Sequence, residues 1–243
     1  MDAAIYTVMS GAERALRAQS VHANNLANLE TGGFRADLEL ARSEPVKTGY
    51  GYDDRHMSRL EANAVASRVG VVRETGRDLD AAIAGPGYFT VQQGDGEAYT
   101  RSGSFNVEQD GALTLDGRAV LSEGGPIVLP EYSQLVIGKD GTISVQAPGD
   151  KDMQAVDRLK LVNPTGSEVA KNADGLIVAR SGQALPVDDT VTVLSGHLEG
   201  SNVSAIEEMI STMNLNRDFE VQMKLFRATD AMAEEGNKLI GQS

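Results

Sequence analysis

Histidine, serine and acidic side chains could give this chain catalytic or metal-binding chemistry, so their spacing is the first question. The three histidines, His22, His56 and His197, are far apart, and none belongs to an HExxH pattern. Ser195-Gly196-His197 places a hydroxyl beside an imidazole, but sequence neighbours do not build a triad, and no G-x-S-x-G elbow surrounds this serine. The spacing therefore favours packing or surface roles and predicts no catalytic residue, metal site or cofactor.

Aspartate–glycine pairs recur through the middle of the chain and could suggest calcium. No D-x-[DN]-x-[DN]-G loop with a later glutamate occurs, however, so the calcium interpretation lacks its ligand pattern. The same pair is favoured in hairpin turns, where the backbone needs positive φ. We therefore expect turns at Asp95-Gly96, Asp110-Gly111, Asp116-Gly117, Asp140-Gly141 and Asp174-Gly175.

Composition narrows the classes of function. The absence of cysteine excludes disulfides, thiolate catalysis and cysteine metal sites. With 35 acidic and 22 basic side chains, the net charge of -13 argues against binding nucleic acid or an anionic membrane surface. No apolar run approaches the roughly 20 residues that span a bilayer, and the first residues lack a basic segment followed by an apolar one. We expect neither direct membrane insertion nor a cleaved secretory signal.

The middle of the chain, residues 76–199, is predicted to be an antiparallel β domain. Short runs with alternating apolar positions lie between the turn pairs and are typical of strands. These runs are Tyr88-Phe89-Thr90-Val91, Ala112-Leu113-Thr114-Leu115, Leu135-Val136-Ile137 and Thr142-Ile143-Ser144-Val145. Residues 36–75, with Gly49-Tyr50-Gly51-Tyr52, show neither helical nor strand periodicity and are predicted to be an extended connector.

Both ends of the chain show helical periodicity. In residues 1–35, two series with a spacing of seven indicate a helical seam that Thr31-Gly32-Gly33 stops. Residues 200–243 repeat the pattern, and Ser204 with Glu207 fits a capping box at the helix start. The N-terminal series are Ile5, Ala12, Gln19, Leu26 and Met9, Leu16, Ala23; the C-terminal ones are Thr212, Phe219, Phe226, Ala233, Ile240 and Met209, Asn216, Met223, Asp230, Asn237.

These patterns predict an α+β fold in which long N- and C-terminal helices pair as a coiled-coil-like domain, with a central antiparallel β domain between them in the sequence. Each helix would be about 40 to 55 Å long, more than a compact domain of this size can cover. Amphipathic terminal helices often cover only their own core, but here we favour assembly with other chains. The interface candidates are Ile5, Met9, Leu16, Leu26, Phe219, Met223 and Phe226.

The segment 23–35, Ala-Asn-Asn-Leu-Ala-Asn-Leu-Glu-Thr-Gly-Gly-Phe-Arg, closely resembles the amino-terminal signature of flagellar rod and hook proteins. Segments 75–83, 99–105 and 198–203 agree with the same family in the same order. The signature residues are Asn24, Asn25, Leu26, Ala27, Asn28, Thr31, Gly33 and Phe34. The asparagines are poor core residues and moderate helix formers, which leaves two roles open: hydrogen bonding across helix contacts, or ending the helix.

This resemblance, strongest to proximal-rod members, implies a non-enzymatic structural subunit of the hollow flagellar rod, located in the basal body where the rod crosses the periplasm. It further implies export through the flagellar type III export apparatus and assembly with copies of itself and with proximal and distal rod proteins. One alternative is a distal-rod protein of the same family. The other is an exported β protein that binds or cleaves carbohydrate, with the acidic middle as its site.

Overall fold

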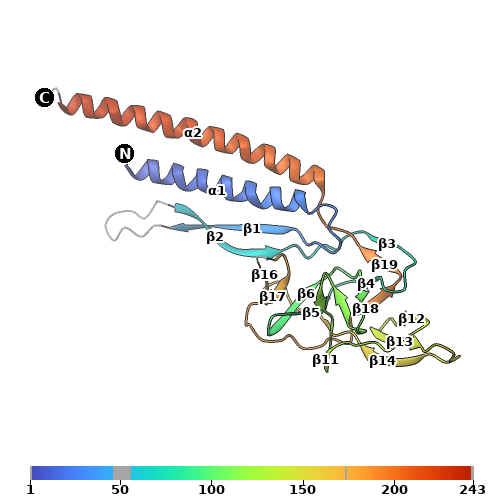
Figure 1. The fold of residues 1–243 in the computed structure, drawn as a ribbon. Helices are drawn as coiled ribbons and strands as arrows, with labels where there is room; N and C mark the ends of the chain where they lie inside the picture. The colour runs from blue at the N-terminus through green and yellow to red at the C-terminus, as the bar shows by residue number, and fades with distance from the viewer. Residues whose placement is uncertain (1, 46–55, 173, 242–243) are drawn as a thin grey trace. The chain divides into compact units, whose positions relative to one another are not determined.

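A computed structural model describes residues 2–45, 56–172 and 174–241. Two long helices occupy the ends of the chain, α1 (Asp2–Ala27) and α2 (Ala205–Gly241), and all named strands lie between them (Figure 1). The expected α+β fold, with terminal helices and a central antiparallel β region, is confirmed. The tyrosine- and glycine-rich motif at 49–52 lies outside the described residues.

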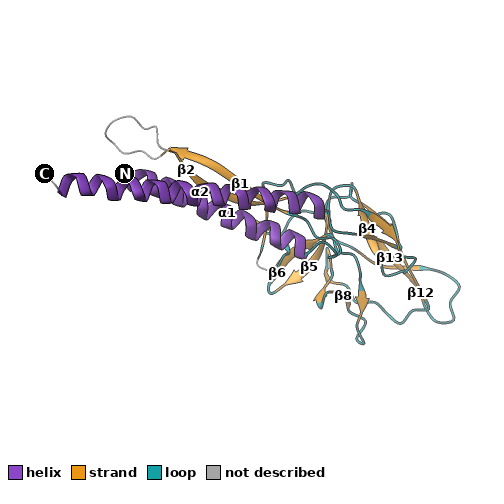
Figure 2. Ribbon diagram, turned by 90° about the horizontal axis from the view of Figure 1, so that it is seen from above, coloured by secondary structure: helices purple, strands orange, loops and turns teal. Residues whose placement is uncertain are grey.

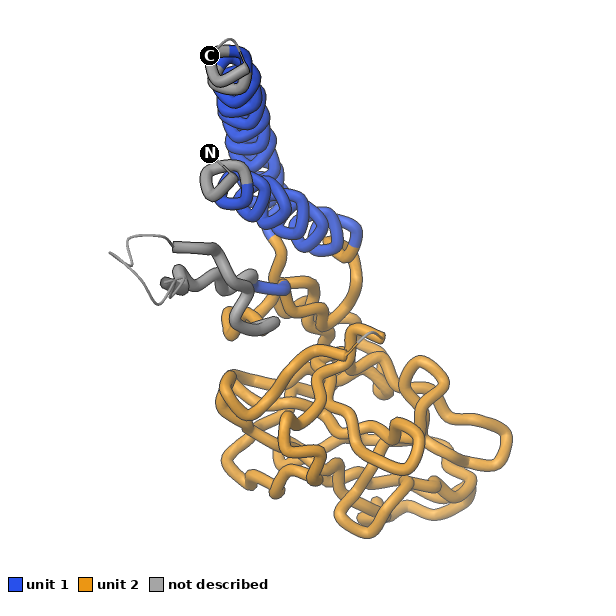
Figure 3. Tube along the Cα trace, turned by 90° about the vertical axis from the view of Figure 1, so that its left-hand side faces the viewer, with its two compact units in different colours: residues 1–27, 37–63, 204–243 blue, residues 28–36, 64–203 orange. Residues whose placement is uncertain are grey.

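The chain divides into two compact units, coloured separately in Figure 3. The helical unit contains Met1–Ala27, Asp37–Asn63 and Ser204–Ser243, and the β unit contains Asn28–Ala36 and Ala64–Val203. The polypeptide therefore passes between the units four times, at positions 27/28, 36/37, 63/64 and 203/204.

In the helical unit, α1 and α2 lie side by side and run in opposite directions (Figures 1 and 2). The start of α2 contains half of the predicted capping box, because the Glu207 amide donates to the Ser204 hydroxyl at 3.5 Å. Strands β1 (Asp37–Pro45) and β2 (His56–Val65) form a two-stranded sheet. The segment predicted as an extended connector thus contains two strands that pair with each other. The local sequence pattern did not reveal this pairing.

The strands of the β unit form several small sheets, and every register described between them is antiparallel. One sheet has the order β15 (Leu161–Val162), β5 (Tyr88–Gln93), β6 (Gly96–Thr100), β17 (Ile177–Ala179) and β16 (Val169–Lys171). Two more are β7 (Asn106–Val107), β8 (Leu113–Leu115), β9 (Arg118–Ala119) and β12 (Gln134–Ile137), β13 (Thr142–Gln146), β14 (Gln154–Arg158). The pairs are β3 (Val72–Glu74) with β19 (His197–Glu199), β4 (Ala81–Ala84) with β18 (Thr192–Ser195), and β10 (Leu121–Ser122) with β11 (Gly125–Pro126).

The core of the β unit consists mainly of aliphatic side chains around one aromatic pair. Phe89 and Phe105 are fully buried and pack edge to face, with ring centroids 5.3 Å apart. Buried positions alternate with exposed ones along β12 and with half-buried ones along β13, as the sequence pattern predicts for strands with one covered face. The four predicted strands correspond to β5, β8, β12 and β13.

Most predicted Asp-Gly turns have the expected backbone. Asp116 and Gly117 join β8 to β9 and both have positive φ, at 49° and 74°, as a two-residue hairpin requires. The prediction at Asp95-Gly96 is wrong by one position. Gly94 has the positive φ of 56°, while Gly96 already begins β6.

Candidate assembly surfaces and a buried junction

The face that α1 turns toward α2 is made of small and polar residues. Ala15 and Ala18 are buried, and a Cβ at Gly11 would displace the flexible amide end of the Gln222 side chain of α2. Gln19 donates to Asn216 of α2 at 3.2 Å. Small residues allow two helices to approach closely, so this face explains the pairing without large apolar contacts.

The predicted interface residues occupy other positions on the helices. Met9, Leu16 and Leu26 are exposed on α1, while Phe219, Met223 and Phe226 are half-buried on α2. Ile5 lies within α1, but its side chain is outside the described set. Of the sevenfold series on α1, Gln19 bonds α2, while Met9, Leu16 and Leu26 are exposed. The buried positions of α1 are Ala15, Ala18 and Asn25, which lie outside that series.

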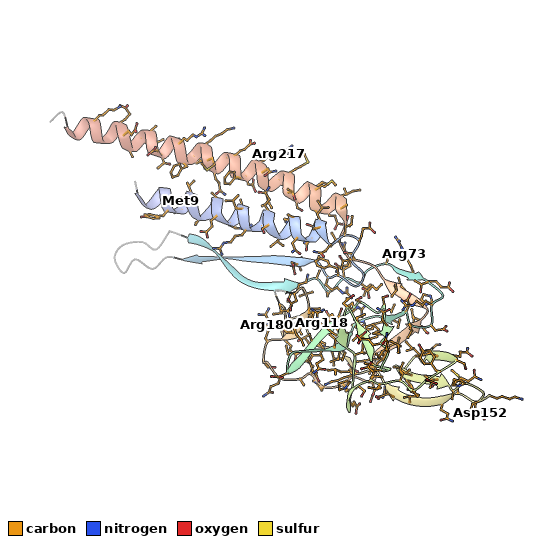
Figure 4. All side chains as sticks on the ribbon, in the orientation of Figure 1. Met9, Arg73, Arg118, Asp152, Arg180 and Arg217 are labelled. Carbon is orange, nitrogen blue, oxygen red and sulfur yellow. The ribbon has the colours of Figure 1, made fainter. Side chains whose placement is uncertain are left out.

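Four of these predicted residues meet in one apolar groove between the helices. Met9 and Leu16 line it from α1, and Met223 and Phe226 line it from α2. The groove has a volume of about 570 Å³, and its few polar residues include Ser10 and Glu13. Figure 4 shows the side chains of the two helices, with Met9 labelled.

A second apolar surface lies on the first three turns of α2, and only one of its residues, Met209, belongs to the sevenfold series. Its residues follow i, i+3, i+4, i+7 spacing and are all more than half exposed. Ile210 is nine positions from Phe219, or two and a half helical turns, so it points to the opposite side of α2. We call Ile206, Met209, Ile210 and Met213 the outer stripe.

A polar junction joins α1, β1 and α2 within the helical unit. The buried Asn25 side chain accepts a hydrogen bond from the Asp37 amide at 2.8 Å and donates to the Asp37 carbonyl at 3.0 Å. It also donates to the Glu208 carboxylate at 3.2 Å, which in addition pairs with the His22 ring. Asn25 therefore has the first of the two roles left open, hydrogen bonding across helix contacts.

Asn28 lies in the turn that follows α1. Its side-chain oxygen accepts from the Thr31 hydroxyl at 3.1 Å, and its carbonyl accepts from the Thr31 amide at 3.3 Å. This asparagine contributes to ending the helix, which is the second role. The signature continues into the β unit, where the Lys171 ammonium lies 3.6 Å from the centroid of the Phe34 ring.

The β unit contains a buried ionic cluster that sequence reasoning did not single out. The side chains of Arg35, Arg101 and Glu199 are 4%, 0% and 1% exposed. Nη2 of Arg35 lies 3.1 Å from one carboxylate oxygen. Nε of Arg101 lies 2.8 Å from the other carboxylate oxygen of Glu199. The two atoms form an ion pair, but they are not aligned as a hydrogen bond. Burial lowers the pKa of the Arg101 guanidinium, and the Glu199 carboxylate opposes that shift.

This cluster brings together three of the sequence stretches that carry the family resemblance. Arg35 ends the amino-terminal signature, Arg101 lies in the 99–105 stretch, and Glu199 lies in the 198–203 stretch. Their separation along the chain hides the cluster from pattern reasoning. The only sign of the cluster in the sequence was that each of the three resembling stretches contains a charged residue.

The described residues support no catalytic interpretation of the histidines. His197 bonds the backbone carbonyl of Ser195 at 2.7 Å, so its Nδ1 is engaged away from the serine hydroxyl. His22 pairs with Glu208, and the side chain of His56 is outside the described set. Within the described ranges, no cluster of histidine, cysteine and acidic residues could hold a metal, and neither helix is apolar enough to cross a membrane.

Comparison with known proteins places this architecture in a class. The family model "Flagella basal body rod protein" matches residues 5–35, "Flagellar hook protein FlgE/F/G D1 domain" matches 82–145, and "Flagellar basal body rod FlgEFG protein C-terminal" matches 194–239. The flagellar basal-body rod protein FlgF of Escherichia coli K12 is 42% identical over the whole of both chains. FlgF of Salmonella typhimurium is 40% identical over the whole of both, and FlgF of Caulobacter vibrioides is 32% identical over 100% of this chain and 99% of that one.

Terminal helices, a central β region and these matches define an axial structural protein of the bacterial flagellar rod-and-hook class. Within that class, the chain belongs to the FlgF family of flagellar basal-body rod proteins. It is a structural subunit of the basal-body rod, and not an enzyme.

Proposed function

We propose that this chain is a proximal-rod subunit that assembles through its terminal helices into the hollow shaft that transmits torque. Its partners are copies of itself and the neighbouring proximal and distal rod proteins, and it reaches the rod through the flagellar type III export apparatus. The helices pair in a coiled-coil-like manner. The chain functions as four parts: residues 1–35 and 200–243 as the inner helical domain, 36–75 as connector, and 76–199 as β domain.

The apolar groove is the observation that carries this proposal. Met9, Leu16, Met223 and Phe226 meet in one groove that the described part of the chain leaves open. Complete burial of such a side chain contributes about 1.5 to 3 kcal/mol to the free energy of association. A neighbouring helix seated in the groove would therefore gain stability at every subunit contact.

The outer stripe supports assembly in a specific geometry. Ile210 points to the side of α2 opposite Phe219, while Met209, at the edge of the stripe, lies nearer the side on which Met223 lines the groove. Two different apolar surfaces on one chain allow head-to-tail contacts, which build helical filaments rather than closed dimers. A hollow rod requires contacts of that open kind.

Purified basal bodies test the proposal. A strain whose only copy of this protein carries an epitope tag is expected to yield rods in which electron microscopy places the tag in the proximal segment. A deletion strain should stall before the distal rod appears. Label confined to the distal segment, or complete rods in the deletion strain, would contradict the proximal assignment.

A further inference from the structure

The segments that lead to the helical unit are bonded to one another inside the β unit. The Gly33 amide donates to the Glu199 carbonyl at 2.8 Å. The Asn202 amide donates to the Phe34 carbonyl at 3.2 Å, and the Ala36 amide donates to the Asn202 side-chain oxygen at 2.7 Å. The chain that follows α1 and the chain that precedes α2 therefore form a short ladder.

A third segment joins the same place. The Gly70 amide donates to Oε1 of Glu199 at 2.8 Å, and the Asn202 side chain donates to the Arg68 carbonyl at 2.7 Å. The Arg35 guanidinium also donates to the Arg68 carbonyl. The passages between the units at 36/37 and 203/204 adjoin these three bonded segments, and those at 27/28 and 63/64 lie about five residues away along the chain.

Arg101 fixes this arrangement to the core. Its guanidinium donates to the carbonyls of Gly87 at 2.8 Å and Gly85 at 2.7 Å, just before β5 begins. The same guanidinium pairs with Glu199. One buried carboxylate thus connects the passing segments, through Arg101, to the backbone of the main sheet.

We propose that Glu199, held between Arg35 and Arg101, is the mechanical tether through which force passes between the β unit and the segments leading to the helices. The inference rests on the proposed role in torque transmission. Apolar contacts are non-directional and allow surfaces to slide. Buried ion pairs and hydrogen bonds are directional and are lost only when the segments separate. Torque carried along the chain reaches these bonds within about five residues of each of the four passages.

Hydrogen exchange on the purified full-length protein tests the tether directly. Glu199→Gln keeps the shape of the side chain but removes its charge, leaving Arg35 and Arg101 uncompensated. We expect roughly tenfold faster exchange at the bonded amides in 33–36, 70 and 202, with unchanged exchange in the core strands. The control is Asp189→Asn, which breaks an exposed ion pair with Arg158 in the same unit, leaves the Arg158 hydrogen bond to the Asp140 carbonyl in place, and should change neither region.

Swimming under load tests the mechanical part. Cells with Glu199→Gln are expected to assemble rods and swim in dilute buffer, but to lose motility in a viscous medium where each rod carries more torque. Arg35→Met provides a second variant that leaves the Arg101 pair intact if Glu199→Gln fails to fold, and it should show the same local exchange and the same loss under load.

Two results would overturn the tether. Exchange that rises uniformly through the β unit in Arg35→Met would make the cluster an ordinary part of the core. Unchanged swimming in viscous medium, despite faster local exchange, would show that force takes another path. The proposed function is tested separately in the parent strain. If the unmodified protein were absent from purified rods, the proposed function itself would fail.

Discussion

Asn25 on α1 and Asp37 at the start of β1 exchange two hydrogen bonds, one in each direction, so that an asparagine side chain takes the place of a neighbouring strand. Asn25→Ala would leave the Asp37 amide and carbonyl without these partners. We expect a loss of about 1 to 3 kcal/mol in the stability of the helical unit. Loss of helical circular dichroism on heating measures it.

The matched control for this change is Asn24→Ala. Asn24 precedes Asn25 in the same helix, and its side chain is exposed. Equal destabilisation by the two substitutions would mean that helix propensity, and not the pairing with Asp37, determines the effect.

Gly33→Ala should be more damaging than Gly76→Ala, although the two glycines share the same backbone conformation, with φ of 68° and 71°. An added Cβ at Gly76 meets nothing within 4 Å, so that variant shows only the left-handed strain of about 1 to 2 kcal/mol. At Gly33 the Cβ would lie well under 3.0 Å from the backbone of Arg101 and Ser102. Denaturant unfolding of both variants should rank Gly33→Ala as clearly less stable, and equal midpoints would contradict the close approach.

Phe226→Asp is expected to block rod assembly while leaving the β unit folded. The substitution removes about 1.5 to 3 kcal/mol of apolar burial from the groove and places a carboxylate there. Ala231→Asp adds the same charge at an exposed position of α2 and serves as the control. Recovery of basal bodies and the melting of the purified protein are the measurements; normal rods with Phe226→Asp would show that the groove is not an interface.

Tyr99 should make the β unit sensitive to alkaline pH. Burial raises the pKa of the Tyr99 phenol from 10.0 to about 12, with the nearby Glu97 carboxylate adding to the rise and the Leu185 amide opposing it. The folded protein therefore holds this proton more tightly than the unfolded chain. The resulting stability is complete below pH 10.0 and is lost as pH rises through about 12.

A difference of this size corresponds to roughly 2 to 3 kcal/mol. The midpoint temperature of thermal unfolding, measured between those pH values, should fall less steeply with rising pH for Tyr99→Phe than for the parent. Tyr132→Phe, at a half-buried tyrosine elsewhere in the β unit, is the control and should keep the parent's slope. Identical slopes for all three proteins would assign the alkaline loss to other groups.

The sequence by itself determined the kinds of element and their order. Helical periodicity at both ends, alternating runs in the middle and most Asp-Gly turns are local properties, because φ preferences and side-chain direction depend on residues only a few positions apart. The amino-terminal signature also determined the family, and the composition already argued against nucleic acid as a partner. Each of these conclusions needed no knowledge of which segments meet.

Only the tertiary structure decided which helix faces are covered and which distant residues share a site. A sevenfold series fits several stripes of one helix, so the pattern alone did not choose between Met9 and Ala15 as the inner position of α1. Ala36 and Asn202 are bonded across 166 positions, and Arg101 joins the same cluster from the turn after β6. Contacts at such separation depend on the folded path of the whole chain, because no local periodicity records where a distant segment will return.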